Sequence, residues 1–506
     1  MDVNLFFVSV DLVWVSTLVG VLQWPSILLS GKQPVSMLAW LLGVTFLPVA
    51  GPLLFFLVGQ NRIKRGLLRK KLTARQSLGP RLPPLEQESW LALEGYREAA
   101  PDMQDLLRLQ GRVGGTPLTT GNRVELLRGA VEKYPRLFAD IQQAQDHINL
   151  EYYILQEDET GNRIADLLLE KSRQGIKVNL ILDTVGTFWL SYRFIDRLRG
   201  GGVQITWFHP INPLNTLKRV LRFNRPKKSR RIRFSPRWNL NLRNHRKIVV
   251  IDGRIGYVGG LNLGDEYLGG KHGFDNWEDL AVRLEGPSVK TLQRIFMEDW
   301  RFSSRLPLRG GEYFPTSNAV PADTRGIVQV VPSGPDEDHG VLGRIYFGAL
   351  CAARTRAWLM TPYFLPDESF QAALINAALK GVDVRVIIPH RSDNSLVDLA
   401  SRSFFVPLIE AGVKIFLFHQ GMLHAKALLV DDDWSAVGTA NMDVRSLRLS
   451  FEAGALIHNR QVAHSLEGFC AAQMGQSTQV TLAEATSRRW YARAAQSLAR
   501  LFSPVL

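Results

Sequence analysis

Two stretches of the chain carry the same spaced set of polar residues, and a short apolar run follows the first residues of each set. Both stretches match H-x-K-x4-D-x6-G-x2-N, the first from His245 to Asn262 and the second from His424 to Asn441. One such match arises easily by chance, but two matches with the same trailing glycine and asparagine do not. The sequence therefore predicts a duplicated unit with one motif in each copy.

The first residues of each motif have the chemistry of a phosphate site. Residues i and i+2 of a strand share one face, so a histidine and a lysine at this spacing point the same way. An imidazole acts as a nucleophile or a proton donor, while an ammonium group and an amide stabilise anionic oxygens. We therefore expect a site for phosphoryl chemistry built from His245, Lys247, His424 and Lys426, with substrate oxygens bound by Asn262 and Asn441.

Four acidic residues near the motifs are candidates for supporting roles. Asp252 and Asp431 complete the motifs, but Asp252-Gly253 also matches a hairpin turn, so a catalytic and a structural role both remain open. A nucleophilic histidine also needs an acceptor at its second ring nitrogen, which fixes the tautomer and the ring orientation. Asp279 and Glu452 follow the two motifs and are our candidates for this orienting role.

The motif-bearing regions have matching patterns of strands and helices. In the first half the pattern predicts strands at 148–155, 177–183 and 203–208 and helices at 164–174 and 194–199. In the second half it predicts strands at 357–365, 383–389 and 413–418 and helices at 370–380 and 408–411. Alternating strands and helices favour an α/β fold with helices on both faces of a sheet. We expect two mixed-sheet lobes related by a pseudo-two-fold axis, with both motifs in one cleft.

The N-terminal region is apolar enough to enter a membrane. Residues 4–29 contain one charged side chain, Asp11, and residues 35–58 contain none, and each run is long enough to span about 30 Å as a helix. A cluster of Lys and Arg follows at 62–71, which favours the cytoplasmic side for the rest of the chain. The two cysteines, Cys351 and Cys470, form no disulfide framework, which suits a reducing compartment.

The first half contains a strongly basic insert, between Phe208 and His245, that the second half lacks. Residues 218–247 contain 13 Lys or Arg and no acidic residue, and the whole chain has a formal net charge of +14. Such a segment fits an anionic lipid surface, and it also fits nucleic-acid phosphates or a solvated loop. We predict a transmembrane hairpin at 1–60, a basic linker at 61–121, a first lobe at 122–315 with the insert at 209–244, and a second lobe at 316–506.

The motifs resemble those of the phospholipase D superfamily, and within it most nearly those of bacterial cardiolipin synthases. The resemblance is carried by Asn244-His245-Arg246-Lys247, Gly259-Gly260-Leu261-Asn262, Thr361-Pro362-Tyr363-Phe364, Gly438-Thr439-Ala440-Asn441 and the closing Ser503-Pro504-Val505-Leu506. It implies the duplicated lobes, the orienting roles of Asp279 and Glu452, and a multi-pass location in the bacterial inner membrane with the catalytic part in the cytoplasm.

The resemblance also implies a reaction. Two phosphatidylglycerol molecules would give cardiolipin and glycerol through a phospho-histidine on His245, with His424 as a protonated donor and later as a base. No Cys/His metal-ligand spacing, phosphate-binding P-loop or dinucleotide fingerprint occurs, so we expect neither a metal nor another cofactor, and we expect the membrane rather than nucleic acid as partner. The alternatives are a phospholipase D-type hydrolase, a transferase with another donor such as phosphatidylethanolamine, a nuclease, or a non-catalytic membrane scaffold. The sequence leaves the oligomeric state open.

Overall fold

The computed structural model describes residues 14–15, 17–30, 34–47, 49–55, 71, 73, 104–208, 243–269, 274–308, 310–315, 326–336 and 340–503. By its internal contacts the chain divides into two units. The first comprises residues 1–73 with 218–240, and the second comprises residues 74–217 with 241–506. The basic insert expected at 209–244 lies outside the described residues except for Arg243 and Asn244.

The first unit contains short apolar helices. Its helices are α2 (Trp24–Leu28), α3 (Pro34–Phe46) and α4 (Ala50–Leu54), and Ile27, Val44 and Phe55 form its small core. Val49 has a φ of 64°, a conformation that interrupts the helical path between α3 and α4. None of the helices in the described ranges combines the length and the apolar character needed to cross a bilayer. Parts of both expected spans, at 4–29 and 35–58, lie outside the described residues.

The second unit contains both halves of the duplication, preceded by helix α7 (Gln104–Val113). The first half comprises β1 (Thr119–Arg128), α8 (Gly129–Gln142), β2 (His147–Tyr152), α9 (Glu159–Arg173), β3 (Lys177–Asp183), α10 (Tyr192–Gly200), β4 (Gln204–Phe208), β5 (Ile248–Ile251), β6 (Ile255–Gly259), η4 (Asp265–Leu268), β7 (Trp277–Glu278), β8 (Leu280–Glu285) and α12 (Ser288–Ser304), followed by η5 (Gly311–Tyr313).

The second half repeats this order. It comprises β9 (Gly326–Ser333), α13 (Val341–Ala352), β10 (Arg356–Met360), β11 (Phe364–Leu365), α14 (Glu368–Leu379), β12 (Asp383–Pro389), α15 (Ser395–Ser401), η7 (Arg402–Phe404), α16 (Phe405–Glu410), β13 (Lys414–Phe418), β14 (Met422–Leu423), β15 (Ala427–Val430), β16 (Trp434–Gly438), β17 (Met442–Asp443), α17 (Val444–Arg448), β18 (Glu452–His458) and α18 (Arg460–Gly475), and the chain continues with β19 (Ser477–Gln479), α19 (Leu482–Thr486) and α20 (Trp490–Arg500).

The strand order is the same in both halves. It runs β1-β8-β6-β5-β2-β3-β4 in the first half and β9-β18-β16-β15-β10-β12-β13 in the second, and β1 pairs antiparallel with β9 where the two sets meet. The expected duplicated α/β fold with a mixed sheet is therefore confirmed. The halves are joined by strand pairing as well as by packing, a connection that the sequence pattern did not predict.

Local sequence signals explain the matching elements. Asp158 caps α9 by accepting a hydrogen bond from the Gly161 amide at 3.0 Å, and Asp367 caps α14 in the same way through Phe370 at 3.0 Å. Gly175 follows α9 with a φ of 87°, and its counterpart in the second half, Gly381, follows α14 with a φ of 89°. Glycine occupies this left-handed conformation without strain, so both helices end where the next strand must begin.

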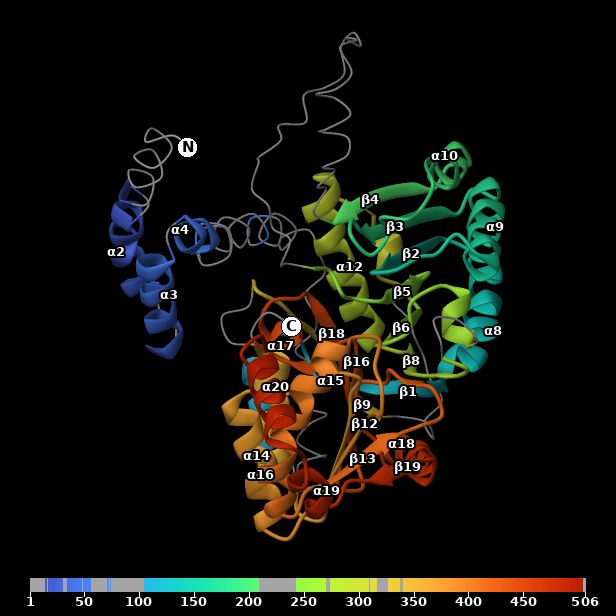
Figure 1. Cartoon of the computed structure of the whole chain (residues 1–506). Helices are drawn as coiled ribbons and strands as arrows, with labels where there is room; N and C mark the ends of the chain where they lie inside the picture. The colour runs from blue at the N-terminus through green and yellow to red at the C-terminus, as the bar shows by residue number, and fades with distance from the viewer. Residues whose placement is uncertain are drawn as a thin grey trace. The chain divides into compact units, whose positions relative to one another are not determined.

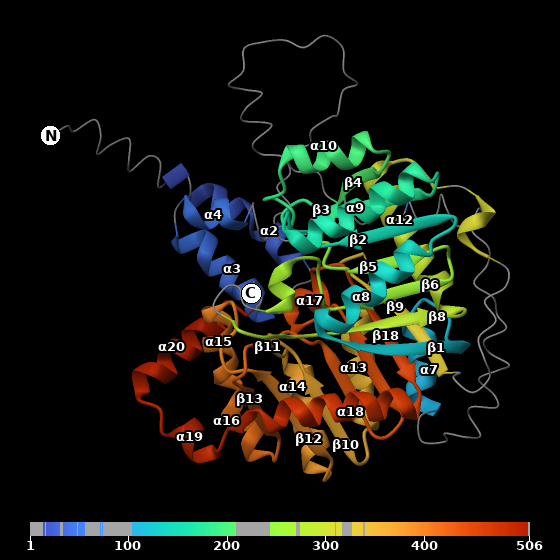
Figure 2. The ribbon, with the colours of Figure 1, turned by 90° about the vertical axis from the view of Figure 1, so that its right-hand side faces the viewer.

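The apolar residues form three layers. Helices α8, α9 and α10 cover the outer face of the first half, whereas α13, α14 and α16 cover that of the second (Figures 1 and 2). A third cluster lies between the halves and joins Val250 and Val282 to Leu429 and Ala455. Figure 2 shows the first half stacked above the second, with the β1, β8, β9 and β18 strands at the junction. The interface between the halves is thus a shared core that keeps elements from both halves in fixed positions.

Helix α7 falls within the region expected to be a linker. Its Leu106 belongs to the core of the second half, and the carbonyl oxygen of Gln110 accepts a hydrogen bond of 3.1 Å from Gln329 Nε2. His458 lies 3.0 Å from the Gln110 side chain. The residues just before β1 are therefore part of the folded unit, earlier in the chain than the boundary at residue 122 suggests.

The two motif aspartates occupy equivalent hairpin turns. Asp252 and Asp431 have φ values of 54° and 52°. The Asp252 carboxylate accepts hydrogen bonds of 2.8–3.0 Å from the amides of residues 145–147, and the Asp431 carboxylate accepts bonds of 2.8–3.2 Å from those of residues 354–356. Each aspartate lies beyond the far end of the strand that follows the motif histidine, roughly 20 Å from it by strand geometry. The structure thus corrects the expected catalytic role of Asp252 and Asp431, because their carboxylates tie the hairpin to the start of the neighbouring strand.

Asp431→Ala should lower the free energy of unfolding by about 1–3 kcal/mol, because three backbone amides lose their acceptor. The loss is measurable by thermal unfolding of the full chain. Asp431→Asn should lower the free energy of unfolding by less, because asparagine keeps one acceptor oxygen and tolerates the left-handed conformation. A large fall in turnover by folded Asp431→Asn protein would restore a chemical role for this residue.

Candidate active site

Each motif histidine lies beside a strand from the other half of the chain. The His245 amide donates to the Phe451 carbonyl at 2.9 Å, and the His424 amide donates to the Glu278 carbonyl at 2.7 Å. Asn244 forms a parallel bridge with Phe451, and β14 pairs in parallel with β7. The two histidines therefore occupy equivalent places in an exchange of segments between the halves.

A carboxylate from the opposite half contacts each imidazole. Glu452 places its two carboxylate oxygens 3.0 and 3.1 Å from His245 Nδ1, and Asp279 Oδ2 lies 2.7 Å from His424 Nδ1. Both carboxylates are fully buried. The sequence nominated Asp279 and Glu452 without assigning partners, and the structure pairs each with the histidine of the other motif. With Nδ1 engaged, Nε2 of each ring is left for chemistry.

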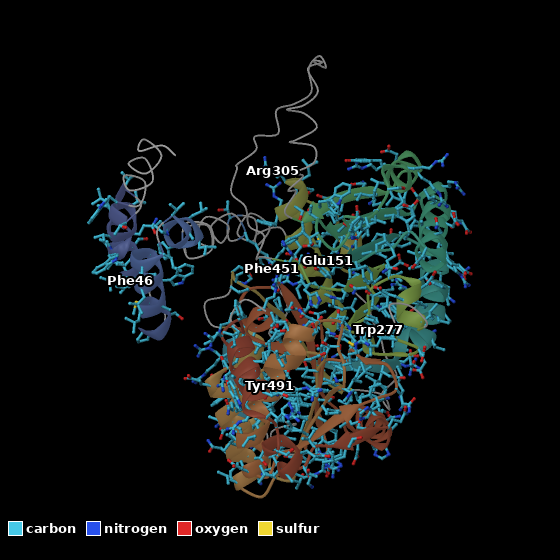
Figure 3. All side chains as sticks on the ribbon, viewed as in Figure 1. Phe46, Glu151, Trp277, Arg305, Phe451 and Tyr491 are labelled. Carbon is cyan, nitrogen blue, oxygen red and sulfur yellow. The ribbon has the colours of Figure 1, made fainter. Side chains whose placement is uncertain are left out.

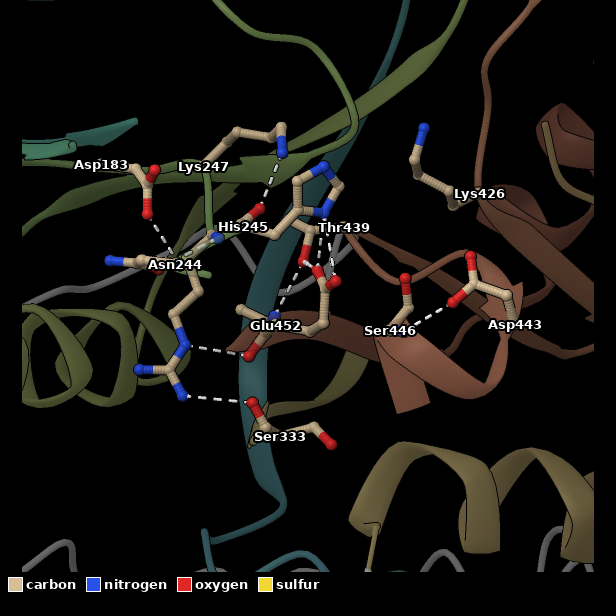
Figure 4. A network of polar contacts seen from close by, with 12 residues as sticks. Asp183, Asn244, His245, Lys247, Ser333, Lys426, Thr439, Asp443, Ser446 and Glu452 are labelled. Atoms are coloured by element: carbon tan, nitrogen blue, oxygen red, sulfur yellow. Dashed lines mark hydrogen bonds and ion pairs between the residues drawn. The ribbon is translucent and has the colours of Figure 1, made fainter. Parts of the chain in front are cut away.

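Two buried lysines complete the centre of the site. Lys247 Nζ donates to the His245 carbonyl at 2.7 Å, while Lys426 Nζ donates to the His424 carbonyl and lies 2.8 Å from His424 Nδ1. Figure 4 shows the His245 ring between the side chains of Lys247 and Lys426. The two motifs are thus brought together into one site, as the duplicated pattern predicted.

Burial and neighbouring charges control protonation in this site. Burial, together with the Lys426 ammonium, lowers the pKa of His424 to about 4, against the opposing charge of Asp279. Burial also lowers the pKa of His245, and it lowers the pKa of Lys426 to about 8. The pKa of Asp279 lies below its usual value, because Lys426 and His424 outweigh the effect of burial. Both histidine pKa shifts favour the neutral imidazole in the free enzyme.

The two motif asparagines have different surroundings. Asn262 is buried, with Oδ1 accepting from the Ile154 amide at 3.2 Å and Nδ2 donating to the Tyr267 hydroxyl at 2.9 Å. Asn441 is also buried, but its Oδ1 has no hydrogen-bond partner within the described part of the chain. Asn262 therefore holds the loop behind the site in place, whereas Asn441 retains an acceptor for another molecule.

Aromatic residues that the motif analysis missed contact both histidines. Tyr153 contacts the His245 ring edge-on with centroids 5.1 Å apart, and Lys247 Nζ lies 5.4 Å from the centre of the same Tyr153 ring. Trp277 lies 5.2 Å from the His424 ring. Tyr153 directly follows β2, whereas Tyr363 lies three residues after β10 and donates its hydroxyl to Asp393 at 2.6 Å. The strand register places Pro362 at the position of Tyr153, so a comparison of the two repeats gives no signal for this tyrosine.

A further difference between the halves lies behind the carboxylates. Thr439 donates its hydroxyl to Glu452, and the same hydroxyl accepts from the Ala453 amide at 2.9 Å. The equivalent residue in the first half is Gly260, where a Cβ would lie 2.1 Å from Asp279 Oδ1. Glycine is therefore required beside Asp279, whereas a hydroxyl positions Glu452. Within the described residues, no group of three or more His, Cys, Asp and Glu side chains is arranged to hold a metal ion.

Comparison with known proteins agrees with this geometry. Residues 137–300 and 346–471 match the protein family described as "Cardiolipin synthase, PLD-like domain", and residues 12–60 match "Phospholipase_D-nuclease N-terminal". The cardiolipin synthase of Geobacillus kaustophilus is 36% identical over 478 residues, which is 94% of this chain and 90% of that protein. Cardiolipin synthase 2 of Bacillus anthracis is 34% identical over 488 residues, covering 95% of this chain and 88% of that protein.

The chain belongs to the cardiolipin synthase family. The resemblance inferred from the two motifs is therefore confirmed. Among solved structures, the phosphatidylserine synthase of Haemophilus influenzae is similar with a TM-score of 0.54 and 16% identity, covering 80% of this chain and all of that one. This likeness supports the shared fold of the duplicated α/β unit.

Lys426→Met should raise the pKa of His424 from about 4 toward the value of a free imidazole, because a neighbouring positive charge that opposes the imidazolium is removed. Titration of ring-labelled histidine by nuclear magnetic resonance measures the change. Lys380→Met, which removes an exposed lysine elsewhere, should leave the titration of His424 as it is. A His424 pKa that stays constant or falls in Lys426→Met would contradict the electrostatic account of the site.

Proposed function

We propose that this protein is a cardiolipin synthase that transfers a phosphatidyl group from one phosphatidylglycerol to another. The observation that carries the proposal is the pairing of two imidazoles from opposite halves, each held at Nδ1 by a carboxylate of the other half. With Nδ1 of each ring held by a carboxylate, we propose that both Nε2 atoms act on one substrate phosphorus, one for attack and one for proton transfer. The names of the family and of its relatives support the same substrate class.

The first step forms a phospho-histidine. His245 Nε2 attacks the phosphodiester phosphorus of one phosphatidylglycerol, the bond to the glycerol oxygen breaks, and His424 gives its proton to the departing glycerol. In the second step a hydroxyl of another phosphatidylglycerol passes its proton to His424 and attacks the same phosphorus. The phosphorus–nitrogen bond breaks, cardiolipin leaves, and both histidines return to their starting states. One phosphodiester replaces another, so no nucleotide is consumed.

Substrate charge accounts for the protonation of His424. In the free site, burial and Lys426 keep the pKa of His424 at about 4. A phosphodiester anion bound beside the ring raises that pKa, because an opposite charge favours the imidazolium. Lys247 and Lys426, which contact histidine carbonyls in the free site, then turn to the anionic oxygens and stabilise them as charge develops. The proton donor is therefore formed when the substrate binds.

The Asn441 amide supports a role in alcohol binding. Its Oδ1 is buried without a partner in the described residues, and an amide oxygen accepts hydrogen bonds from hydroxyl groups. An acceptor at this point can hold the incoming or departing glycerol hydroxyl. Asn262 contributes indirectly, because both ends of its amide already bind the protein.

We further propose that residues 1–60 anchor the enzyme in the bacterial inner membrane as a helical hairpin. The first unit exposes large apolar side chains that its small core does not cover, including Leu22, Leu29 and Phe46 (Figure 3). The basic residues at 62–71 favour the cytoplasmic side for the catalytic unit. The basic insert at 209–244 would add attraction to anionic lipid.

His245→Ala and His424→Ala should each lower cardiolipin formation by at least about 10³-fold, because each removes a group that forms or breaks a bond to the reacting atoms. Mass spectrometry of lipids made by the purified full chain from phosphatidylglycerol alone measures the product. His464→Ala, which removes an exposed histidine outside the site, should retain full turnover. Substantial synthesis by either motif variant, or release of phosphatidic acid in place of cardiolipin by the unaltered protein, would contradict the proposal.

A further inference from the structure

Helix α20 turns its apolar side toward solvent. Large apolar residues recur at helical spacing along α20 and the two residues after it, and their exposed fractions are 80% for Trp490, 52% for Tyr491, 60% for Leu498, 74% for Leu501 and 49% for Phe502. Figure 3 labels Tyr491 on this helix. A helix that is stabilised by the protein core normally buries such a stripe, so α20 presents an apolar surface that its own unit does not cover.

The buried side of α20 is narrow and made of small or polar residues. Gln496 and Ala499 are buried against the rest of the unit, and α20 packs on α15 and η7. The Arg500 guanidinium lies 4.4 Å from the ring centre of Phe404 in η7. The helix is therefore held in place by one face while the opposite, apolar face stays open.

The charges around this face fit an anionic lipid surface. Residues 487–503 contain Arg488, Arg489, Arg493 and Arg500 and no acidic residue. On a helical projection Arg493 and Arg500 fall together on one side of the apolar stripe. An apolar face of Trp, Tyr, Leu and Phe beside arginines is the pattern of helices that lie in the headgroup region of a bilayer. A second copy of the same face would place arginines against arginines with no acidic residue at 487–503 to pair with them, and like charges facing each other are unfavourable, so an anionic lipid surface fits this face better than a second copy of the chain.

Helix α20 is linked to the second half's side of the site through the elements it packs on. α15, on which α20 packs, starts directly after Asp393 and Asn394, and Asp393 accepts the hydrogen bond of Tyr363. The Ser401 hydroxyl of α15 donates to the Phe364 carbonyl at 2.7 Å, and β11, which contains Phe364, pairs with β17 immediately after Asn441. α20 is thus connected through α15 and β11 to the second half's side of the site.

The first half has exposed aromatic residues at the corresponding place. In the loop that leads from β3 to α10, the exposed fraction of Trp189 is 90%, and Phe188 is also exposed. Tyr192, at the start of α10, is exposed as well. This loop begins at Asp183, whose carboxylate accepts from the Asn244 amide at 3.1 Å beside the first motif histidine. Both halves therefore carry exposed aromatic residues on segments that connect to the site.

We propose that α20 is an interfacial helix that lies in the headgroup layer of a bilayer rich in anionic phospholipid and holds the mouth of the cleft against its lipid substrates. The inference rests on the proposed function for its biological meaning, because a phosphatidyl transferase must draw both substrates from the membrane. The arginines bind lipid phosphates while the stripe enters the boundary with the acyl chains. The lipid surface is in this way a partner of the catalytic unit itself, separate from the apolar N-terminal region.

The first experiment places a fluorescent probe in the stripe of the full chain. Ala494→Cys, in a background with Cys351→Ala, is labelled with an environment-sensitive dye and reconstituted into vesicles of phosphatidylglycerol and phosphatidylcholine. The emission maximum of the dye should shift to shorter wavelength, and brominated lipid should quench its fluorescence. The same dye attached at Glu170→Cys, an exposed position on α9, should show neither the emission shift nor the quenching. Absence of the shift at residue 494 would overturn the proposal. A shift that depends on protein concentration without vesicles would assign the face to a second copy and would also overturn it.

The second experiment measures how the stripe affects activity. Leu498→Glu with Leu501→Glu should lower the ratio of the rate on phosphatidylglycerol vesicles to the rate in detergent mixed micelles by about tenfold or more, because only vesicles need the enzyme to be oriented at a surface. The matched control is Val131→Glu, which adds one charge to an equally exposed apolar position on α8 and should leave the ratio unchanged. An equal fall in both assays, or a ratio within about twofold of the unaltered protein, would overturn the proposal. If the unaltered protein makes no cardiolipin in either assay, the proposed function fails while the probe experiment still decides the role of α20.

Discussion

The contact between each histidine and a carboxylate of the opposite half is the interaction on which the site depends. His245 needs Glu452 and His424 needs Asp279, so neither half can orient its own imidazole. A buried carboxylate without its partner is costly, because the charge has lost its water and gained nothing in return. The shared core and the β1–β9 pairing keep the two halves close enough for both exchanges. Duplication in this chain is therefore a requirement of the chemistry, since one copy supplies only half of each catalytic pair.

The two halves are not equivalent where the carboxylates are held. Glu452 is bound by the Thr439 hydroxyl, whereas Asp279 is bound by the Leu280 amide at 2.7 Å and lies against Gly260. The longer glutamate side chain needs a hydroxyl to fix it, and the shorter aspartate is fixed by its own backbone neighbour. Lys426 lies 2.8 Å from its histidine's ring nitrogen, whereas Lys247 contacts only the carbonyl of its histidine. These differences give the imidazoles distinct environments, which two successive roles in one reaction require.

Much of this architecture is visible in the sequence. The strands predicted at 177–183 and 383–389 coincide with β3 and β12, because continuous apolar runs between turn residues are typical of buried parallel strands. The motif residues also converge as the repeat predicts. Asp431 shows where the pattern misleads, because a residue shared by both motifs need not lie near the others once a strand separates them. The exchange of carboxylates was not predictable, because it depends on how two complete halves pack together, and no local signal records that packing.

The electrostatics of the free site suggest why an anionic substrate is needed to complete it. Burial lowers the pKa of both lysines and of both histidines, which means that positive charge is unfavourable there without a counter-charge beyond Asp279 and Glu452. A phosphodiester supplies that charge at the one place where all four groups meet. Its binding favours the charged lysines and the imidazolium together, so affinity for the anion and formation of the proton donor are the same event. A neutral molecule of the same shape would leave His424 without a proton, and selectivity for phosphodiesters therefore follows from the burial of the site as well as from its shape.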